Sequence, residues 1–280
     1  MQLIAFDLDG TLCNTIADIA ASMNRALCAH NIPAYTQEEI QSMVGHGMKE
    51  LCRSAMPRGR EPEWEQVMKT YYADYSVHLC DSTQPYPGIR ETLHSLRQRG
   101  LKLAVVSNKP HQNTEDMLHC LFQDWKELFD CIQGQDPRFP VKPDPASLLY
   151  VLDALKVSPE KSLYVGDSDV DFAFARNAGL HFCGAAWGFK GRQLLEDLYG
   201  RWETVLVPMT LVRSQSYRDV LLPMKEKGLD VRLVILEAEA ATLHDRILAR
   251  GEEENCWCME SIPMARAGSA ALPADIRLTT

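Results

Sequence analysis

Apolar and polar positions follow two rhythms along most of the chain. Residues 2–6 form a short apolar run that ends at two acidic residues, a pattern typical of a buried parallel strand. Further strands are predicted at residues 101–107, 129–133, 161–166 and 181–187. Between them, helices are predicted through Ile89, Leu93 and Leu96, over 111–122 and near 145–155. This alternation predicts an α/β fold with a Rossmann-like, doubly wound parallel sheet.

The segment 14–85 lacks a strand pattern and carries helical stripes instead. Apolar side chains recur at three- and four-residue steps from Ile16 to Leu27. Before this stripe, Thr15 and Asp18 resemble a capping box. A second stripe runs over residues 64–75. We therefore expect an all-helical subdomain inserted after the first strand.

Length and composition are typical of a soluble globular protein. The chain has 280 residues, which leaves room for about two folded units. Hydrophobic residues make up 46% and charged residues 24%, which disfavours disorder and fibrous repeats. The formal net charge of −9 repels phosphate backbones, so no nucleic-acid partner is expected. No run of about 18 apolar residues is present, so no membrane span is expected either.

The cysteines and the N-terminus indicate a cytoplasmic protein. The nine cysteines are odd in number and show no C-x-x-C spacing, so we interpret them as reduced thiols. The first eight residues lack the basic region of a secretion signal. None of these features indicates an oligomeric state.

Polar side chains gather at three predicted strand ends. Because the carboxyl ends of parallel strands form one edge of the sheet, these groups are expected to converge. Clustered carboxylates repel one another and call for a cation, and oxygen ligands favour Mg²⁺. Such an ion would bind one oxygen of a phosphate, and Lys142 could neutralise another. The groups are Asp7 and Asp9, then Ser107 and Asn108, and then Asp167 and Asp171.

Each of these residues has a purely structural alternative. Asp9 and Gly10 form a common turn pair, and Lys142 could be a solvated loop lysine. The polar pairs at the other two strand ends could cap the helices that follow. Asp169 is assigned to such a helix start, because nothing requires a further carboxylate. Only the joint occurrence of all the groups favours a functional site.

Four segments together carry a family resemblance. They are residues 7–11 (DLDGT), 106–110 (VSNKP), 142–145 (KPDP) and 165–171 (VGDSDVD). Their order and spacing resemble the four motifs of the haloacid dehalogenase superfamily, and most closely its phosphoglycolate phosphatase-like members. The similarity spans about residues 1–195. It implies a core formed by residues 1–13 and 86–202, with a helical cap at 14–85.

The resemblance also implies catalytic roles. Asp7 would be the nucleophile that forms an aspartyl-phosphate, and Asp9 would protonate the leaving alcohol and later deprotonate water. Mg²⁺ would be held by the carboxylates of Asp7 and Asp167 and by the backbone carbonyl of Asp9. Asp171 would support these ligands without touching the ion, or would reach it through a water molecule. The substrate-binding residues would be Thr11, Ser107, Asn108 and Lys142.

The cap contains a glycine-rich loop, residues 44–49 (VGHGMK), in which His46 and Lys49 are candidate substrate contacts. The alternative is that its glycines start a helix and both basic residues are solvated. The carboxylate at Asp9 argues against the dehalogenase and phosphonatase branches of the superfamily, which resemble this chain in fold but lack an acid there.

Residues 203–280 have an α/β pattern of their own and resemble part of a tunicamycin-resistance-type P-loop kinase. A strand is predicted at 231–236, between helices near 215–227 and 239–250. The phosphate-binding pattern G-x-x-x-x-G-K-[ST] is missing, so a kinase-like fragment without a P-loop is expected. It could complete the sheet edge, mediate association or remain loosely packed.

The leading hypothesis is a Mg²⁺-dependent phosphatase of small phosphomonoesters similar to phosphoglycolate. A phosphotransferase or phosphomutase that uses the same intermediate remains an alternative. A catalytically impaired fusion that acts as an interaction protein is another.

Overall fold

The computed structural model describes residues 1–185, 187–190, 234–237 and 276–279. The chain divides into two compact units, Met1–Pro208 and Met209–Thr280. In the second unit, β8 (Val234–Glu237) pairs in parallel with β9 (Ile276–Thr279), and β8 overlaps the predicted strand. The two helices predicted around that strand lie outside the described residues. So does most of the kinase-like segment, whose resemblance stays a prediction.

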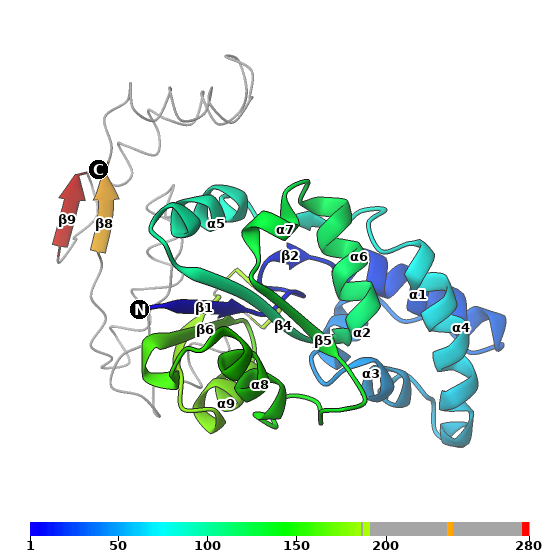
Figure 1. Cartoon of the computed structure of the whole chain (residues 1–280). Helices are drawn as coiled ribbons and strands as arrows, with labels where there is room; N and C mark the ends of the chain where they lie inside the picture. The colour runs from blue at the N-terminus through cyan, green and yellow to red at the C-terminus, as the bar shows by residue number, and fades with distance from the viewer. Residues whose placement is uncertain (186, 191–233, 238–275, 280) are drawn as a thin grey trace, which may run out of the picture. The chain divides into compact units, whose positions relative to one another are not determined.

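The first unit contains the expected parallel sheet, with the strand order β5-β4-β1-β6-β7 (Figure 1). All neighbouring strands in it are parallel. The central strand β1 has β4 on one side and β6 on the other, so the strand order switches direction beside β1. The strands are β1 (Leu3–Phe6), β4 (Lys102–Pro110), β5 (Cys131–Gln135), β6 (Ser162–Gly166) and β7 (His181–Gly184).

Helices cover both faces of this sheet (Figure 1). Alternate side chains of β1 enter two separate cores: Ile4 and Phe6 pack on one face, and Leu3 and Ala5 on the other. This double burial explains why the strand is continuously apolar in sequence. The first core includes side chains from α5 (Ile89–Gln98), α6 (His111–Leu121) and α7 (Trp125–Leu128). The second includes side chains from α8 (Ala146–Leu155) and α9 (Asp169–Asn177). The short helix η2 (Pro159–Lys161) lies between these two helices in the sequence.

The expected helical insert lies between two short antiparallel strands, β2 (Cys13–Asn14) and β3 (Gln84–Pro85). The apolar stripe of α1 is buried, as the sequence predicted, and α1 packs against α4. The described elements of the insert are α1 (Ile16–Ala29), α2 (Gln37–Met43), α3 (Met48–Ser54), η1 (Glu61–Glu63) and α4 (Trp64–Val77). The exact domain boundaries remain a prediction.

The capping box predicted at the start of α1 is wrong. Thr15 makes no side-chain capping hydrogen bond. The buried carboxylate of Asp18 instead accepts hydrogen bonds from the backbone N–H groups of Ser82 and Thr83, at 3.0 and 2.8 Å, and from the Thr83 hydroxyl at 2.7 Å. The N–H groups of Ser82 and Thr83 lie outside helices and strands, and leaving them buried without an acceptor would cost free energy. The Asp18 carboxylate therefore stabilises the fold more by accepting from them than it would by capping α1. Asp18 thus ties the beginning of the insert to its end.

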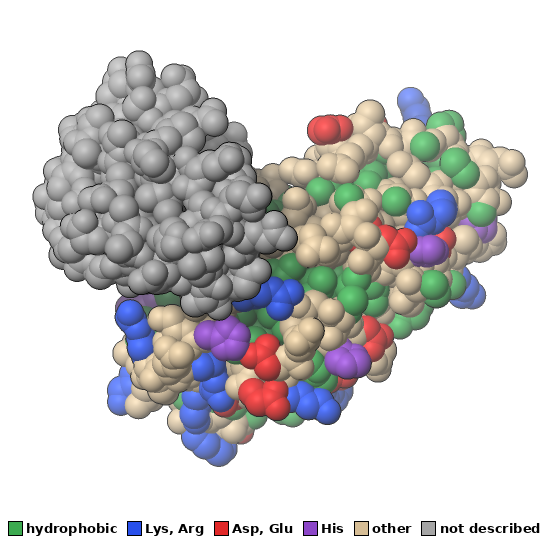
Figure 2. Space-filling view, turned by 90° about the horizontal axis from the view of Figure 1, so that it is seen from above, with side chains coloured by type: hydrophobic (Ala, Val, Ile, Leu, Met, Phe, Trp, Pro, Cys, Tyr) green, Lys and Arg blue, Asp and Glu red, His purple; other side chains and the backbone are tan. Residues whose placement is uncertain are grey.

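The surface and the cysteines add two observations. Acidic, basic and His side chains are interspersed on the face of the described residues seen in Figure 2. No helix in the described part of the chain has both the length and the apolar character needed to cross a membrane. Within that part, no disulfide bond joins any of the cysteines.

Candidate active site

A pocket with a volume of about 60 Å³ lies at the carboxyl ends of β1, β4 and β6. It brings together most of the side chains singled out in the sequence. Side chains of the helical insert, among them Val44, Met48 and Leu51, complete its wall. The predicted residues that line it are Asp7, Asp9, Ser107, Asn108, Lys142 and Asp167. The segments that carry them are far apart in sequence and meet because of the strand order.

Two predicted residues lie outside the pocket lining. Thr11 is fully buried, its hydroxyl has no hydrogen-bond partner among the residues that the structure describes, and its carbonyl accepts a hydrogen bond from the Trp187 indole. Asp171 lies behind the pocket, where it contacts Lys142. Thr11 therefore does not line the pocket, and Asp171 is connected to it through Lys142.

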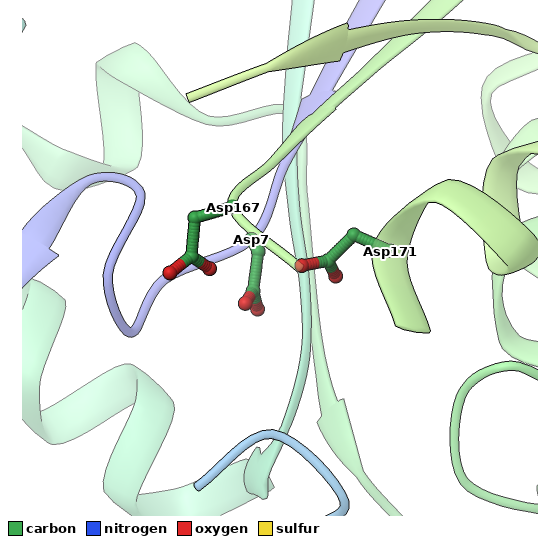
Figure 3. A group of neighbouring side chains, drawn as sticks. All are labelled: Asp7, Asp167 and Asp171. Carbon is green, nitrogen blue, oxygen red and sulfur yellow. The ribbon is translucent and has the colours of Figure 1, made fainter. Parts of the chain in front are cut away.

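Three buried carboxylates form an acidic cluster. Asp7, Asp167 and Asp171 each offer an oxygen, and these atoms lie within 4.8 Å of one another. Figure 3 shows Asp7 and Asp167 side by side, with Asp171 reaching toward Asp7 from the start of α9. Asp9 is not in this group, because its carboxylate is turned to Lys109. The cluster has the composition and spacing of a site for a divalent cation.

Burial sets the electrostatics of the cluster. Desolvation raises the pKa of Asp7 from 3.8 to about 6, against the opposing attraction of Lys142. Desolvation also raises the pKa of Asp167 well above its ordinary value, and the charges of Asp171 and Asp7 add to this effect. Both carboxylates would therefore ionise more readily beside a further positive charge. This is the electrostatic condition in which a bound cation is stabilising.

Lys142 is the positive charge inside this cluster. Its ammonium lies 2.9 Å from Asp7 Oδ1 and donates hydrogen bonds to Asp171 Oδ1 at 2.7 Å and to the Tyr164 hydroxyl at 3.1 Å. Tyr164 in turn donates to the carbonyl of Val106 at 2.6 Å. Nothing in the sequence singles out Tyr164, which has the pattern of an ordinary residue of a buried strand. Its hydroxyl helps to fix the lysine beside the predicted nucleophile.

The donors and acceptors in the cluster fit a metal ion. Asp171 is satisfied by protein groups, since Oδ2 accepts a hydrogen bond from the Ser168 hydroxyl at 2.6 Å and Oδ1 is bound to Lys142. Among the described residues, the hydrogen bond that Asp167 accepts comes from the backbone N–H of Phe189 and reaches Oδ2. Asp7 Oδ1 is buried and has no hydrogen-bond partner in the described part of the chain, although the Lys142 ammonium lies 2.9 Å away. Oxygens of Asp7 and Asp167 are therefore left to coordinate a cation.

Glycine is required where the loop after β1 passes Asp167. A Cβ atom at Gly10 would lie 2.3 Å from Asp167 Oδ2, and Gly10 has a φ of +77°. A Cβ at Gly188 would lie 2.2 Å from the Asp167 Cβ. Any side chain at either position would displace the carboxylate. The two glycines thus allow Asp167 to lie between two stretches of backbone.

Asn108 does more than line the pocket. Its amide oxygen accepts a hydrogen bond from the Lys142 N–H at 2.7 Å, and its amide nitrogen donates to the Lys142 carbonyl at 3.2 Å. The same nitrogen donates to the carbonyl of Gly45 in the insert at 3.0 Å. Ser107, its neighbour, is buried beside the pocket and accepts a long hydrogen bond from the Lys109 N–H. Asn108 therefore joins three segments and has few groups left for a substrate.

The acid and base candidate Asp9 has a partner that the sequence analysis missed. Lys109 Nζ lies 2.9 and 3.2 Å from the two Asp9 carboxylate oxygens and 2.6 Å from the hydroxyl of Tyr75 in α4. Lys109 directly follows Asn108 in the VSNKP segment, which was the only available signal. The helical stripe had marked Tyr75 simply as a core residue.

The glycine-rich loop contributes backbone and apolar groups to the pocket. Val44, Gly45, Gly47 and Met48 line it, and Gly47 is the N-cap of α3, as the structural alternative proposed. His46 and Lys49 are exposed and do not line it.

The structural alternative made Asp167 the capping residue of α9, but the N-cap is Ser168. Ser168 and Asp171 form a capping box, so Asp171 serves both the helix and Lys142. Asp169, assigned to the helix start, pairs with Lys190 at the exposed surface.

Comparison with known proteins identifies related chains. The family model described as haloacid dehalogenase-like hydrolase matches residues 4–185. A phosphoglycolate phosphatase of Haemophilus influenzae is 34% identical over 196 residues, which cover 67% of this chain and 87% of that protein. One from Aquifex aeolicus is 34% identical over 189 residues, with 68% and 86% covered. The crystal structure of a predicted phosphoglycolate phosphatase from Haemophilus somnus matches with a TM-score of 0.66 at 28% identity, covering 74% of this chain and 93% of that one.

Proposed function

The chain belongs to the haloacid dehalogenase-like hydrolase family, and from this premise we propose that it is a Mg²⁺-dependent phosphatase of small phosphomonoesters such as 2-phosphoglycolate. One observation carries the proposal. A buried carboxylate, Asp7, lies 2.9 Å from a buried ammonium, Lys142, inside an acidic cluster that can hold a cation. This arrangement places a nucleophile and charge-neutralising groups around one point, which phosphoryl transfer requires.

Asp7 attacks phosphorus in this proposal, and the bond from phosphorus to the leaving oxygen breaks as an aspartyl-phosphate forms. Asp9 delivers its proton to the leaving oxygen and then takes a proton from the water that cleaves the aspartyl-phosphate. Lys142 remains beside the phosphoryl oxygens and Asp7 throughout. Asp7, Asp167 and the Asp9 carbonyl would hold Mg²⁺, with Asp171 supporting them. The ion would supply positive charge that stabilises the phosphoryl oxygens.

The helical insert supplies part of the pocket wall that a leaving group would meet. The insert presents Val44, Met48 and Leu51 to this space, so the part of the leaving group that reaches the insert would contact apolar side chains. The relatives named as phosphoglycolate phosphatases make 2-phosphoglycolate the first substrate to test.

Release of inorganic phosphate from a panel of phosphomonoesters tests the proposal. The panel contains 2-phosphoglycolate, sugar phosphates and p-nitrophenyl phosphate, each assayed with Mg²⁺ and with excess EDTA. We expect release that needs Mg²⁺ and is lost in Asp7→Asn, whereas Lys156→Ala, which changes an exposed lysine, retains it. No release from any substrate, or full activity of Asp7→Asn, would overturn the proposal. Isomerised sugar phosphate without inorganic phosphate would identify a phosphomutase instead.

A further inference from the structure

Lys109 is buried between the core of the first unit and its helical insert. Its side chain is 2% exposed, although lysine normally reaches solvent. Its ammonium lies 2.9 and 3.2 Å from the oxygens of Asp9 and 2.6 Å from the hydroxyl of Tyr75. It also lies 4.6 Å from the centre of the Tyr75 ring. One cation therefore connects the predicted acid and base with helix α4.

These contacts constrain all three groups. A buried ammonium is costly unless it is paired and hydrogen-bonded, and Asp9 and Tyr75 provide that compensation. Tyr75 is itself held by Tyr71, whose ring stacks on it with centroids 5.3 Å apart and an interplanar angle of 9°. Because Lys109 touches both carboxylate oxygens, it limits rotation of the Asp9 side chain. The preferred orientation of Asp9 thus depends on a residue of the insert.

The predicted metal site does not account for Lys109. Its ammonium contacts Asp9, which lies outside the cluster of Asp7, Asp167 and Asp171. The lysine of that cluster is Lys142, which contacts Asp7 and Asp171. The pocket therefore contains two buried lysines that contact different carboxylates.

We propose that Lys109 is a positioning residue for proton transfer by Asp9, held in place by Tyr75 of the insert. This inference rests on the proposed phosphatase function. As the bond from phosphorus to the leaving oxygen breaks, the Asp9 proton forms the new O–H bond of the alcohol, and Asp9 becomes a carboxylate paired with Lys109. In the second half, Asp9 takes a proton from water while oxygen bonds to phosphorus and the bond from phosphorus to Asp7 breaks.

The leaving group separates this role from general support of the fold. An alkoxide leaves poorly unless it is protonated, whereas p-nitrophenolate leaves readily as an anion. A defect confined to proton delivery therefore slows an alkyl phosphate far more than p-nitrophenyl phosphate. A defect in folding or in phosphate binding slows both substrates by a similar factor.

The test compares kcat/KM for 2-phosphoglycolate and p-nitrophenyl phosphate in the full chain with Mg²⁺, because this ratio reports the steps up to departure of the leaving group and not the later hydrolysis of the aspartyl-phosphate, which both substrates share. For Lys109→Met we expect a loss of about 100-fold with the alkyl substrate and a few-fold at most with the aryl substrate. Tyr75→Phe retains the ring and removes only the hydroxyl, and we expect a loss of about 10-fold confined to the alkyl substrate. Lys102→Met is the matched control, because Lys102 starts the same strand and donates to the carbonyl of Leu155. Lys102→Met should not slow one substrate more than the other.

A double variant tests whether Lys109 acts through Asp9. If it does, adding Lys109→Met to Asp9→Asn causes no further loss with the alkyl substrate. Equal losses for both substrates, additive losses in the double variant, or full activity of both Lys109→Met and Tyr75→Phe would overturn the inference. If Lys109→Met does not fold, the losses of Tyr75→Phe with the alkyl and the aryl substrate still test the inference. A failure of the proposed function differs from all of these, because the unmodified protein would then release phosphate from neither substrate.

Discussion

The side-chain amide of Asn108 pairs with both backbone polar groups of Lys142, a residue 34 positions further along the chain. This double hydrogen bond fixes the loop that places the Lys142 ammonium beside Asp7. The same amide also donates to Gly45 of the insert. Asn108 therefore determines the position of a charge that it does not itself touch.

Replacement of Asn108 by alanine should impair phosphoryl binding and turnover together. The buried N–H and C=O of Lys142 lose their partners, so the loop moves and the ammonium no longer keeps its place beside Asp7. We expect kcat/KM for phosphomonoesters to fall by about 100-fold or more, which is about 3 kcal/mol of transition-state stabilisation. Steady-state phosphate release measures the effect.

Asn24→Ala is the matched control for that variant. Asn24 pairs in the same double manner with the backbone of Tyr35, inside the insert and away from the pocket lining. It should lower the unfolding midpoint and leave kcat/KM within a few-fold of the unmodified protein. Equal kinetic losses in the two variants would contradict a specific role for Asn108.

Gly10→Ala should damage the proposed metal site. The new Cβ would lie 2.3 Å from Asp167 Oδ2 and would displace that carboxylate. Gly100→Ala separates this clash from backbone strain, because Gly100 has a similar φ, +75° against +77°, with no atom within 4 Å of the added Cβ. Each variant should lose about 1 kcal/mol of stability from the left-handed backbone. Only Gly10→Ala should require a higher Mg²⁺ concentration for activity, and the same requirement in Gly100→Ala would refute the argument.

In the metal-free protein, Asp7→Asn should be stabilising, and more so as the pH rises. Burial raises the pKa of Asp7 from 3.8 to about 6, so between these values the folded state binds a proton that the unfolded chain has released. The free energy of unfolding therefore falls as pH increases through this range. Asparagine lacks this penalty, and its advantage should grow from near zero at about pH 4 to as much as about 3 kcal/mol above pH 7.

Urea denaturation in EDTA at several pH values measures that difference. Mg²⁺ should then stabilise the unmodified protein more than Asp7→Asn, because the ion compensates the buried charge. An advantage of Asp7→Asn that stays constant with pH would contradict the assigned pKa.

The sequence predicted the sheet because hydrophobic burial leaves a direct signal in it. The apolar runs at 2–6 and 161–166 correspond closely to β1 and β6. The predicted strand at 101–107 was shorter than β4, which continues to Pro110 and pairs there with Gln135 after an irregularity. Its last residues are polar groups buried in the pocket, so hydrophobic periodicity could not include them.

Contacts between distant polar residues were the part that the sequence could not provide. Periodicity identified the buried face of the helix that carries Tyr75, but it contains no information about a partner 34 residues away. Lys109 and Asp9 are 100 residues apart and meet only because β4 pairs with β1. The error at Asp18 has the same origin, since a local capping pattern cannot compete with buried N–H groups brought close by the fold.

The most direct test of the account is detection of phosphate on Asp7 itself. Asp9→Asn is mixed with p-nitrophenyl phosphate and Mg²⁺, quenched in acid, digested, and examined by mass spectrometry. Because this substrate needs little proton delivery while hydrolysis of the intermediate needs a base, the aspartyl-phosphate should accumulate. The account predicts one added phosphate on the peptide that contains Asp7. It predicts none on the corresponding peptide of the double variant that carries both Asp7→Asn and Asp9→Asn. Rapid phosphate release by an enzyme that never carries phosphate on Asp7 would contradict it.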